Sequence, residues 1–342
     1  MPSLPHKPAL DPTSTTILVT GASGHIASHI VNEALQLGYR VRGTARTKEK
    51  CDNTTKIYDN SNYSAVVVSD FSKPSPEIDE AVKGVDSVMM VASDTTFSED
   101  AKSVIEGVVH GVEAFLRAAA KEGSVKRFTL TSSSSAVLVP RPNVEMSVDA
   151  NTWDDEAVEG AWKRKGEAIG PNPYPFVVYA ASKTEGERAM WRFMREEKPG
   201  FVCNAVLPNT NFGRVLRGGS SGATGGMLVD LFREGRRAFL PPQYYVDVID
   251  DARLHLCAAV LDGSLENERI FAFAGPFNWN DAVDAIGRVR PDCKVKLEKD
   301  PDEGRDLSKV PNQLGAELLR KWFGQDGYKS FDQCVKENLE GV

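Results

Sequence analysis

The chain has 342 residues, of which 41% are apolar and 26% charged, as in ordinary soluble globular proteins. Its 41 basic and 48 acidic side chains give a net charge of −7, which repels a phosphate polymer, so we expect no nucleic-acid partner. No segment reaches the roughly 18 apolar residues of a membrane span, so we expect no membrane partner. The five cysteines form no C-x-x-C pair, which predicts reduced thiols and a cytoplasmic location.

The first 16 residues contain four prolines and predict a short, loosely held arm. The segment that follows has the pattern of a βαβ unit. TILVT (16–20) is a short apolar run, and YRVRGTA (39–45) is a second one. Between them, apolar residues recur at helical spacing from Ile26 to Leu37, and Gly38 ends the run.

Further apolar runs alternate with segments of helical periodicity. The runs cover residues 65–68, 85–92, 128–131 and 201–207, and the helical segments include 100–121 and 179–197. Continuous apolar runs are typical of parallel strands that are covered by helices on both faces. We therefore predict an α/β fold with a Rossmann doubly wound parallel sheet.

The composition changes after Pro208. The glycine- and serine-rich segment 214–226 predicts a mobile loop rather than another βα repeat. We predict a dinucleotide-binding Rossmann domain over 1–208, completed by a strand and helix at about 244–262. Residues 209–243 and 263–342 are then expected to form a smaller, substrate-binding lobe.

A glycine-rich turn joins the first strand to the first helix. Small residues there let the backbone approach a pyrophosphate, whose charge the helix N-terminus stabilises. An ordinary tight turn is the alternative interpretation. The cofactor-binding residues predicted in this turn are Thr20, Gly21, Ser23, Gly24, His25 and Ile26. His25 and His29 are four residues apart but lack the intervening glutamate of a zinc protease motif, so we expect no metal.

The second strand indicates which nicotinamide cofactor binds. NAD-binding chains usually carry an acidic residue here, whereas a 2′-phosphate needs arginine. This strand ends without a carboxylate and with basic residues, which favours NADPH. Arg46 offers a bidentate fork, with Arg42 or Lys48 as supporting charge, unless the cluster is only a solvated turn. Asp70 is a candidate for the adenine amino group or a plain turn residue.

Tyr179 and Lys183 are four residues apart at the expected opening of a helix, which places them on one face. The lysine charge, together with an oxidised nicotinamide nearby, is expected to lower the tyrosine pKa from about 10. Tyr179 then becomes a proton donor for a carbonyl that receives hydride. Ser133, after the strand RFTLT, is expected to donate a second hydrogen bond to the carbonyl oxygen.

These motifs resemble the extended short-chain dehydrogenase/reductases, and most of all the fungal NADPH-dependent aldehyde and ketone reductases related to dihydroflavonol 4-reductase. The matching segments are TGASGHIASH, VRGTAR, VKRFTLTSSSSAV, DANTW, YAASKTEGE, LPNTNFG, PPQYYV and GRDLSKV. The resemblance implies a catalytic Ser133, Tyr179 and Lys183, with Ser132 or Ser134 competing for the serine role. It also implies that Lys183 binds the nicotinamide ribose. Further cofactor contacts are expected at Ala92 and Pro208, and substrate contacts at Phe97, Gln243 and Tyr244.

The sequence thus predicts an NADPH-dependent reductase of aldehydes and ketones, with keto esters as a further substrate class. A sugar-nucleotide epimerase or dehydratase shares the fold and the Tyr-Lys pair, and is the first alternative. A protein that binds NADPH as a signal without turnover is the second. We expect a small-molecule carbonyl substrate and a monomer or homodimer.

Overall fold

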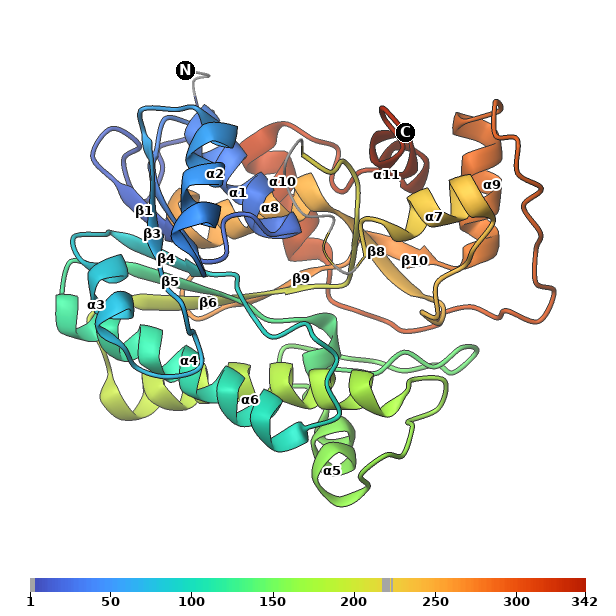
Figure 1. Cartoon of the computed structure of the whole chain (residues 1–342), viewed down its shortest axis with the longest axis horizontal. Coiled ribbons are helices and arrows are strands. Elements are labelled where there is room, and N and C mark those ends of the chain that lie inside the picture. Colours follow the sequence, from blue (N-terminus) through green and yellow to red (C-terminus); the bar gives the residue numbers. More distant parts are fainter. Residues whose placement is uncertain (1–3, 217–221, 223) are drawn as a thin grey trace.

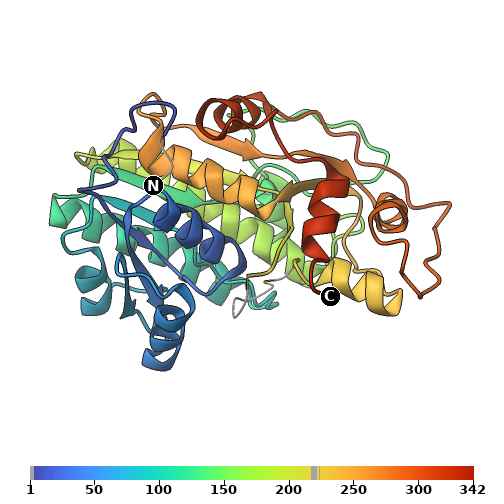
Figure 2. The ribbon, with the colours of Figure 1, turned by 90° about the horizontal axis from the view of Figure 1, so that it is seen from above.

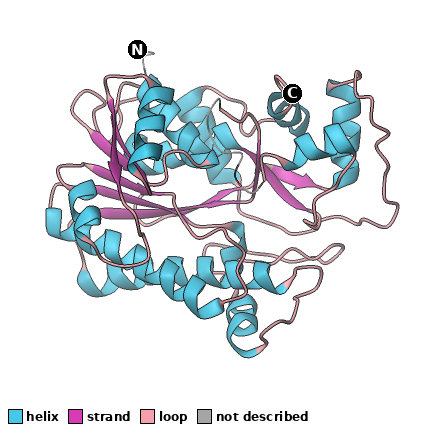
Figure 3. Ribbon diagram, in the orientation of Figure 1, coloured by secondary structure: helices cyan, strands magenta, loops and turns pink. Residues whose placement is uncertain are grey.

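Seven parallel strands form the central sheet of the larger unit, as the computed structural model shows (Figures 1 and 3). The structure describes residues 4–216, 222 and 224–342, so part of the loop expected at 214–226 lies outside the described residues. In spatial order the strands are β3 (Tyr63–Val67), β2 (Arg40–Ala45), β1 (Thr16–Val19), β4 (Ser87–Met90), β5 (Arg127–Thr131), β6 (Val202–Pro208) and β9 (Arg269–Ala272).

The chain winds outward in both directions from β1. Strands β2 and β3 follow on one side, and β4, β5, β6 and β9 on the other. This order confirms the predicted doubly wound Rossmann fold. Ligands of such sheets bind outside the carboxyl ends of the strands, at the point where the strand order reverses, which here lies between β1 and β4.

Helices cover both faces of this sheet (Figure 1). Ile17 and Val19 face one helix layer and Leu18 faces the other, so alternate side chains of the strand are buried on opposite faces. The first layer contains α1 (His25–Gln36), α2 (Lys48–Tyr58), α8 (Val248–Leu256) with its π-helical continuation η2 (Cys257–Leu261), and α10 (Gln313–Phe323). The second contains α3 (Pro76–Val82), α4 (Ala101–Glu122) and α6 (Tyr174–Glu197), with α5 (Asp155–Lys163) packed against α6. No helix in the described part of the chain is long and apolar enough to cross a membrane.

A smaller lobe lies beyond one end of the sheet (Figures 1 and 2). Its three-stranded sheet has the order β10 (Gly275–Phe277), β8 (Gln243–Asp247) and β7 (Thr210–Phe212). Three helices pack around it, namely α7 (Met227–Glu234), α9 (Trp279–Val289) and α11 (Phe331–Asn338). Phe212, Phe277 and Trp279 lie at the centre of its separate core.

The chain passes between the two units more often than the predicted boundaries imply. The strand expected to rejoin the large sheet near 244 is β8, which pairs with β7 and β10 in the small sheet. Conversely, β9 and α10 belong to the larger unit, although they lie within the range 263–342 assigned to the lobe. The reason is burial: every residue of β9 is buried beside β6, and α10 inserts Leu319 into the core shared with α8.

The N-terminal arm is held more firmly than its prolines predict. The backbone N–H groups of Ala9 and Leu10 donate to the carbonyls of Leu261 and Val260 at 2.9 and 3.0 Å. The Tyr39 hydroxyl donates to the Leu10 carbonyl at 3.0 Å. From Ala9 onward the expectation of a loose arm is therefore wrong.

Candidate active site

A cavity of about 550 Å³ lies between the carboxyl ends of the central strands and the smaller lobe. We call it the cleft. Most of the residues predicted from the sequence line it, although they come from segments more than 200 residues apart. They are Gly21, Ser23, Gly24, His25, Ile26, Arg46, Ala92, Phe97, Ser133, Tyr179, Lys183, Pro208 and Gln243.

The turn between β1 and α1 forms a cradle at the base of the cleft. Gly21 has φ +67°, and a Cβ atom there would lie 3.1 Å from the Cβ of Ala92, so glycine is needed for both conformation and space. Gly24 is the N-cap residue just before α1 and provides no side-chain cap, which leaves helix N–H groups available to an anion. This turn fits the diphosphate of a dinucleotide.

Thr20 shapes this turn from behind and does not line the cleft. Its hydroxyl accepts hydrogen bonds from the backbone N–H groups of Val91 and Ala92, both at 2.9 Å. The side chain therefore joins the end of β1 to the segment after β4. Thr20 was predicted to contact the cofactor directly, but in this structure its side chain instead stabilises the turn.

His25 is buried at the start of α1, and neither ring nitrogen has a hydrogen-bond partner among the described residues. Burial lowers the pKa of His25 to about 3, so the ring is neutral near pH 7. Its edge meets the His29 ring at a centroid distance of 5.9 Å, and His29 Nε2 lies 2.7 Å from the Arg214 carbonyl oxygen. In the described chain no group of three or more His, Cys, Asp or Glu residues could hold a metal.

The basic residues near the end of β2 separate into two groups. Arg46 and Lys50 line the cleft, and their charged groups form no ion pair or hydrogen bond with any described residue. Arg42 instead donates to the carbonyls of Ala81 and Lys83, at 2.9 and 2.7 Å, at the end of α3. Lys48 pairs with Asp52 at 2.7 Å and also lies outside the cleft.

These placements correct the prediction for Arg42 and Lys48 and add Lys50, which sequence reasoning missed. Arg42 lies within β2, whereas ligands approach beyond the carboxyl end of a strand, where Arg46 lies. The carbonyl groups at the end of α3 attract the Arg42 cation. Lys50 lies in the first turn of α2, a position that the helix start at Lys48 could have indicated.

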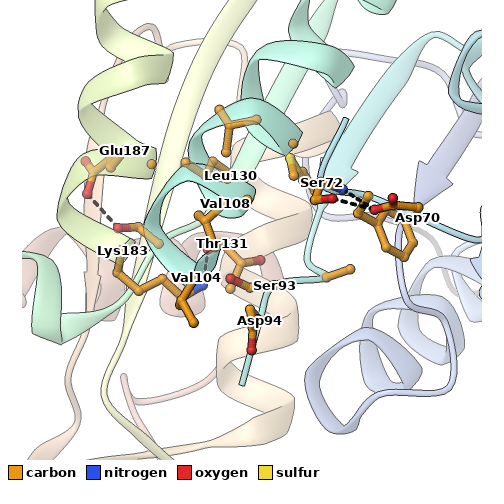
Figure 4. Close-up of a pocket in the computed structure, with 18 of the residues that line it drawn as sticks. Asp70, Ser72, Ser93, Asp94, Val104, Val108, Leu130, Thr131, Lys183 and Glu187 are labelled. Atoms are coloured by element: carbon orange, nitrogen blue, oxygen red, sulfur yellow. Dashed lines mark hydrogen bonds between the residues drawn. The ribbon is translucent and has the colours of Figure 1, made fainter. Parts of the chain in front are cut away.

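Asp70 borders a second cavity of about 360 Å³, which adjoins the cleft and shares Arg46, Ala92 and Lys183 with it (Figure 4). Its Oδ1 accepts hydrogen bonds from the backbone and hydroxyl of Ser72 at 2.8 and 2.6 Å. These bonds and Lys73 lower the pKa of Asp70 to about 2. Asp70 therefore forms a turn and also faces the cavity, and its contact with the adenine amino group stays a prediction.

Tyr179 and Lys183 lie in the second and third turns of α6, because the helix begins at Tyr174 and not at Tyr179. Lys183 Nζ donates to the Thr131 carbonyl at 3.1 Å and lies 5.9 Å from the centre of the Tyr179 ring. Lys183 is buried, and burial lowers its pKa to about 8, although the charge of Glu187 acts in the opposite direction.

The Tyr179 pKa is raised in the protein without cofactor, so Lys183 by itself does not produce the expected lowering, and the effect of a bound nicotinamide stays a prediction. Burial raises the pKa of the phenol, and a hydrogen bond with Ser133 only partly offsets this effect. The distance between the lysine and the ring explains the difference, since the ammonium is held by the Thr131 carbonyl rather than by the phenol oxygen. The phenol is thus held in its protonated form.

The adjacent serines point in different directions. Ser132 donates to the Glu187 carboxylate at 2.6 Å, away from the phenol. Ser133 is the serine that acts on the Tyr179 phenol, lowering its pKa, and it accepts hydrogen bonds from the N–H and hydroxyl of Ser135 at 3.2 and 2.9 Å. It caps the short helix η1 (Ser134–Ala136), whose first residue also lines the cleft. The geometry favours Ser133 over Ser132.

Two of the three predicted substrate contacts, Phe97 and Gln243, line the cleft, and Tyr244 does not. Gln243 lines the cleft, but Tyr244 points away and donates to the Ser308 carbonyl at 2.8 Å. Phe97 lies with its ring centre 5.2 Å from that of Tyr179 and has a φ of +53°. Bulky residues rarely adopt this conformation, so the surrounding structure must hold it there.

Sequence reasoning missed several apolar residues of the cleft. Phe176 lies 6.0 Å from the Tyr179 ring, between ring centres, and its position three residues earlier on the same helix could have indicated this contact. The smaller lobe contributes Met227, Phe239 and Leu240. No local pattern distinguishes these three from ordinary core residues.

The fold and the cleft define a dinucleotide-dependent enzyme of the extended short-chain dehydrogenase/reductase type. The chain belongs to the NAD dependent epimerase/dehydratase family, whose model matches residues 17–220. Aldehyde reductase 2 of Sporidiobolus salmonicolor is 39% identical over 337 residues, which cover 96% of each chain. Ketoreductase adrE of Penicillium roqueforti is 36% identical over 339 residues, again 96% of each. The solved structure of yeast methylglyoxal/isovaleraldehyde reductase Gre2 complexed with NADPH has a TM-score of 0.75 at 24% identity, covering 95% of this chain and 97% of that one.

Proposed function

We propose that this protein is an NADPH-dependent carbonyl reductase that converts aldehydes and ketones to alcohols. The observation that carries the proposal is that Tyr179, Lys183 and Ser133 line one cleft, with the Lys183 ammonium 5.9 Å from the centre of the Tyr179 ring, and that the same cleft contains an uncapped helix N-terminus. The names of the aldehyde reductase and ketoreductase relatives support the same activity.

The residues of the cleft fit NADPH. The turn at Gly21 and Gly24 would hold the diphosphate, and Arg46 with Lys50 would hold the 2′-phosphate. Asp70 borders the adjoining cavity, where the adenine would lie. Lys183 would donate to the nicotinamide ribose. When bound, the cofactor supplies a hydride for the carbonyl carbon.

The protein supplies the proton. A phenol with a raised pKa remains protonated and can donate to the carbonyl oxygen as negative charge grows on it. The Ser133 hydroxyl donates a second hydrogen bond to the same oxygen. The Lys183 ammonium stabilises the phenolate left by the proton transfer, and its proton replaces the one that Tyr179 loses.

The substrate side of the cleft combines apolar side chains with neutral polar ones such as Asn209, Asn211 and Gln243. Among the described residues, the smaller lobe contributes no charged side chain to the lining, and Phe97 and Phe176 flank the phenol. A sugar nucleotide carries a diphosphate that needs cationic partners. The cleft therefore favours a neutral carbonyl compound over the substrate of an epimerase or dehydratase.

Steady-state consumption of NADPH with a panel of aryl ketones, β-keto esters and short aldehydes tests this function. We expect turnover with at least one class, and each mole of NADPH oxidised should yield one mole of alcohol. Absence of turnover despite NADPH binding would favour the signal-binding alternative. Tightly bound NAD⁺ in the purified protein, with epimerisation of a sugar nucleotide, would favour the other alternative.

The pKa of Lys183 predicts a pH limit on activity. The ammonium is charged below a pKa of about 8 and neutral above it. We expect kcat/KM for NADPH, which reports on the free enzyme, to be constant below pH 7 and to decline as the pH rises through 8. A profile that stays flat to pH 10 would contradict the requirement for the charged lysine.

We also propose a cytoplasmic location and a monomeric or homodimeric state. All five cysteines are free, which suits a reducing compartment. Light scattering of the purified protein, at concentrations around the assay range, would distinguish one copy from two.

A further inference from the structure

A buried glutamate lies one helical turn beyond the active-site lysine. Glu187 is 0% exposed, and its carboxylate accepts four hydrogen bonds. The Ser132 hydroxyl donates to Oε2 at 2.6 Å, and Trp191 Nε1 donates to Oε1 at 3.0 Å. Arg269 donates from Nε at 2.7 Å and from Nη2 at 3.1 Å. These four donors match the acceptor capacity of a carboxylate, so Glu187 is held in one position.

Arg269 connects this carboxylate to a distant loop. Its Nη1 donates to the carbonyls of Ala150 and Thr152 at 3.0 and 2.7 Å, and its guanidinium lies 4.1 Å from the centre of the Trp153 ring. The ion pair therefore joins α6, β9, the end of β5 and the loop before α5. A planar guanidinium suits this arrangement because its donors form a rigid fork.

Arg269 pairs directly with this carboxylate, whereas the buried Lys183 ammonium is hydrogen-bonded to the Thr131 carbonyl and is affected by the Glu187 charge from one helical turn away. Lys183 and Glu187 both line the cavity drawn in Figure 4, where they lie on consecutive turns of α6. Burying an unpaired charge is costly, so the carboxylate is needed if Lys183 and Arg269 are both to stay charged. The other ionisable groups on this side are Tyr179 on α6, the cavity-lining Arg46, Asp70 and Asp94, and His255 on α8, which contacts Thr131 Oγ1 at 2.7 Å.

The contact with Ser132 affects the neighbouring serine. Successive side chains at the end of β5 point to opposite sides, so holding Ser132 on Glu187 leaves Ser133 directed at Tyr179. Glu187 thus affects both groups near the phenol. It orients Ser133 by holding the adjacent Ser132, and its negative charge favours the charged form of Lys183.

We propose that Glu187 is a positioning residue of the reductase reaction, which orients Ser133 by holding Ser132 and supplies the counter-charge for the Lys183 ammonium. The inference rests on the proposed function of Tyr179 and Lys183. It assigns a role in turnover to an ion pair that would otherwise serve stability alone.

The test compares Glu187→Gln with Trp191→Phe. Glutamine keeps the shape and can still accept from Ser132 but removes the charge, whereas Trp191→Phe removes one donor to the same carboxylate. We expect Glu187→Gln to lower kcat at least tenfold and to move the alkaline limit of kcat/KM for NADPH at least one pH unit lower. Trp191→Phe should keep kcat within about threefold and the pH limit unchanged. Glu187→Asp, which retains the charge, should restore the position of the limit.

Ser132→Ala examines the orientation separately. It removes the donor and leaves the charges, so we expect a three- to tenfold loss of kcat with an unchanged pH limit. A folded Glu187→Gln protein with the wild-type limit would overturn the proposal. Should Glu187→Gln not fold, Ser132→Ala decides, and wild-type kcat in that variant would overturn it. Failure of the proposed function looks different, since the wild type would then lack turnover or Tyr179→Phe would retain it.

Discussion

Replacement of Tyr179 by phenylalanine is expected to lower kcat by roughly two to four orders of magnitude, the contribution of a positioned general acid. The ring would remain between Phe97 and Phe176, so packing should be preserved and only the hydroxyl lost. Affinity for NADPH should stay within about threefold. The measurements are steady-state carbonyl reduction and a fluorescence titration with NADPH.

Phe176→Leu is a suitable control for this variant, because it changes a neighbour of the phenol on the same helix without removing a proton donor. It should alter KM for the carbonyl substrate far more than the pH dependence of kcat. Near-normal reduction by Tyr179→Phe, with intact folding, would show that another group protonates the alkoxide.

Arg46→Ala is expected to weaken NADPH binding by about ten- to a hundredfold. A hydrogen bond to a charged group contributes about 1.5–3 kcal/mol, and the Arg46 guanidinium has no competing partner among the described residues. NADH lacks the 2′-phosphate, so its affinity should change little. Titration of the variant with both cofactors gives the ratio directly.

Lys48→Ala is the matched control, since Lys48 lies two residues away but pairs with Asp52 outside the cleft. It should leave both affinities unchanged, whereas Lys50→Ala should reduce NADPH affinity less than Arg46→Ala does. Equal losses for NADPH and NADH in Arg46→Ala would mean that the arginine stabilises the turn rather than recognising the phosphate.

Local patterns were sufficient for the doubly wound fold, the dinucleotide turn and the tyrosine-lysine pair. Each depends on residues close together in the chain: apolar periodicity forms β1 and α1, small residues allow the turn at Gly21, and a spacing of four places Tyr179 and Lys183 on one face. Such features are decided by backbone sterics and helix geometry, which short segments carry within themselves. The basic residues at the end of β2 are likewise close together in the chain, and the sequence therefore indicated a phosphate-binding role for Arg46.

Contacts between distant segments decided the rest. Arg42 was expected to support Arg46, but in the structure it donates to carbonyls at the end of α3, and the packing of α2 places Lys50 in the lining of the cleft. The orientation of Ser133 depends on Glu187, which is itself held by Arg269, 82 residues further along the chain. In the protein without cofactor, burial raises the Tyr179 pKa, whereas the predicted lowering was attributed to the Lys183 charge together with an oxidised nicotinamide. Burial, hydrogen-bond partners and charge balance are properties of the assembled core, because the groups that create them meet only when the sheet and the smaller lobe have formed.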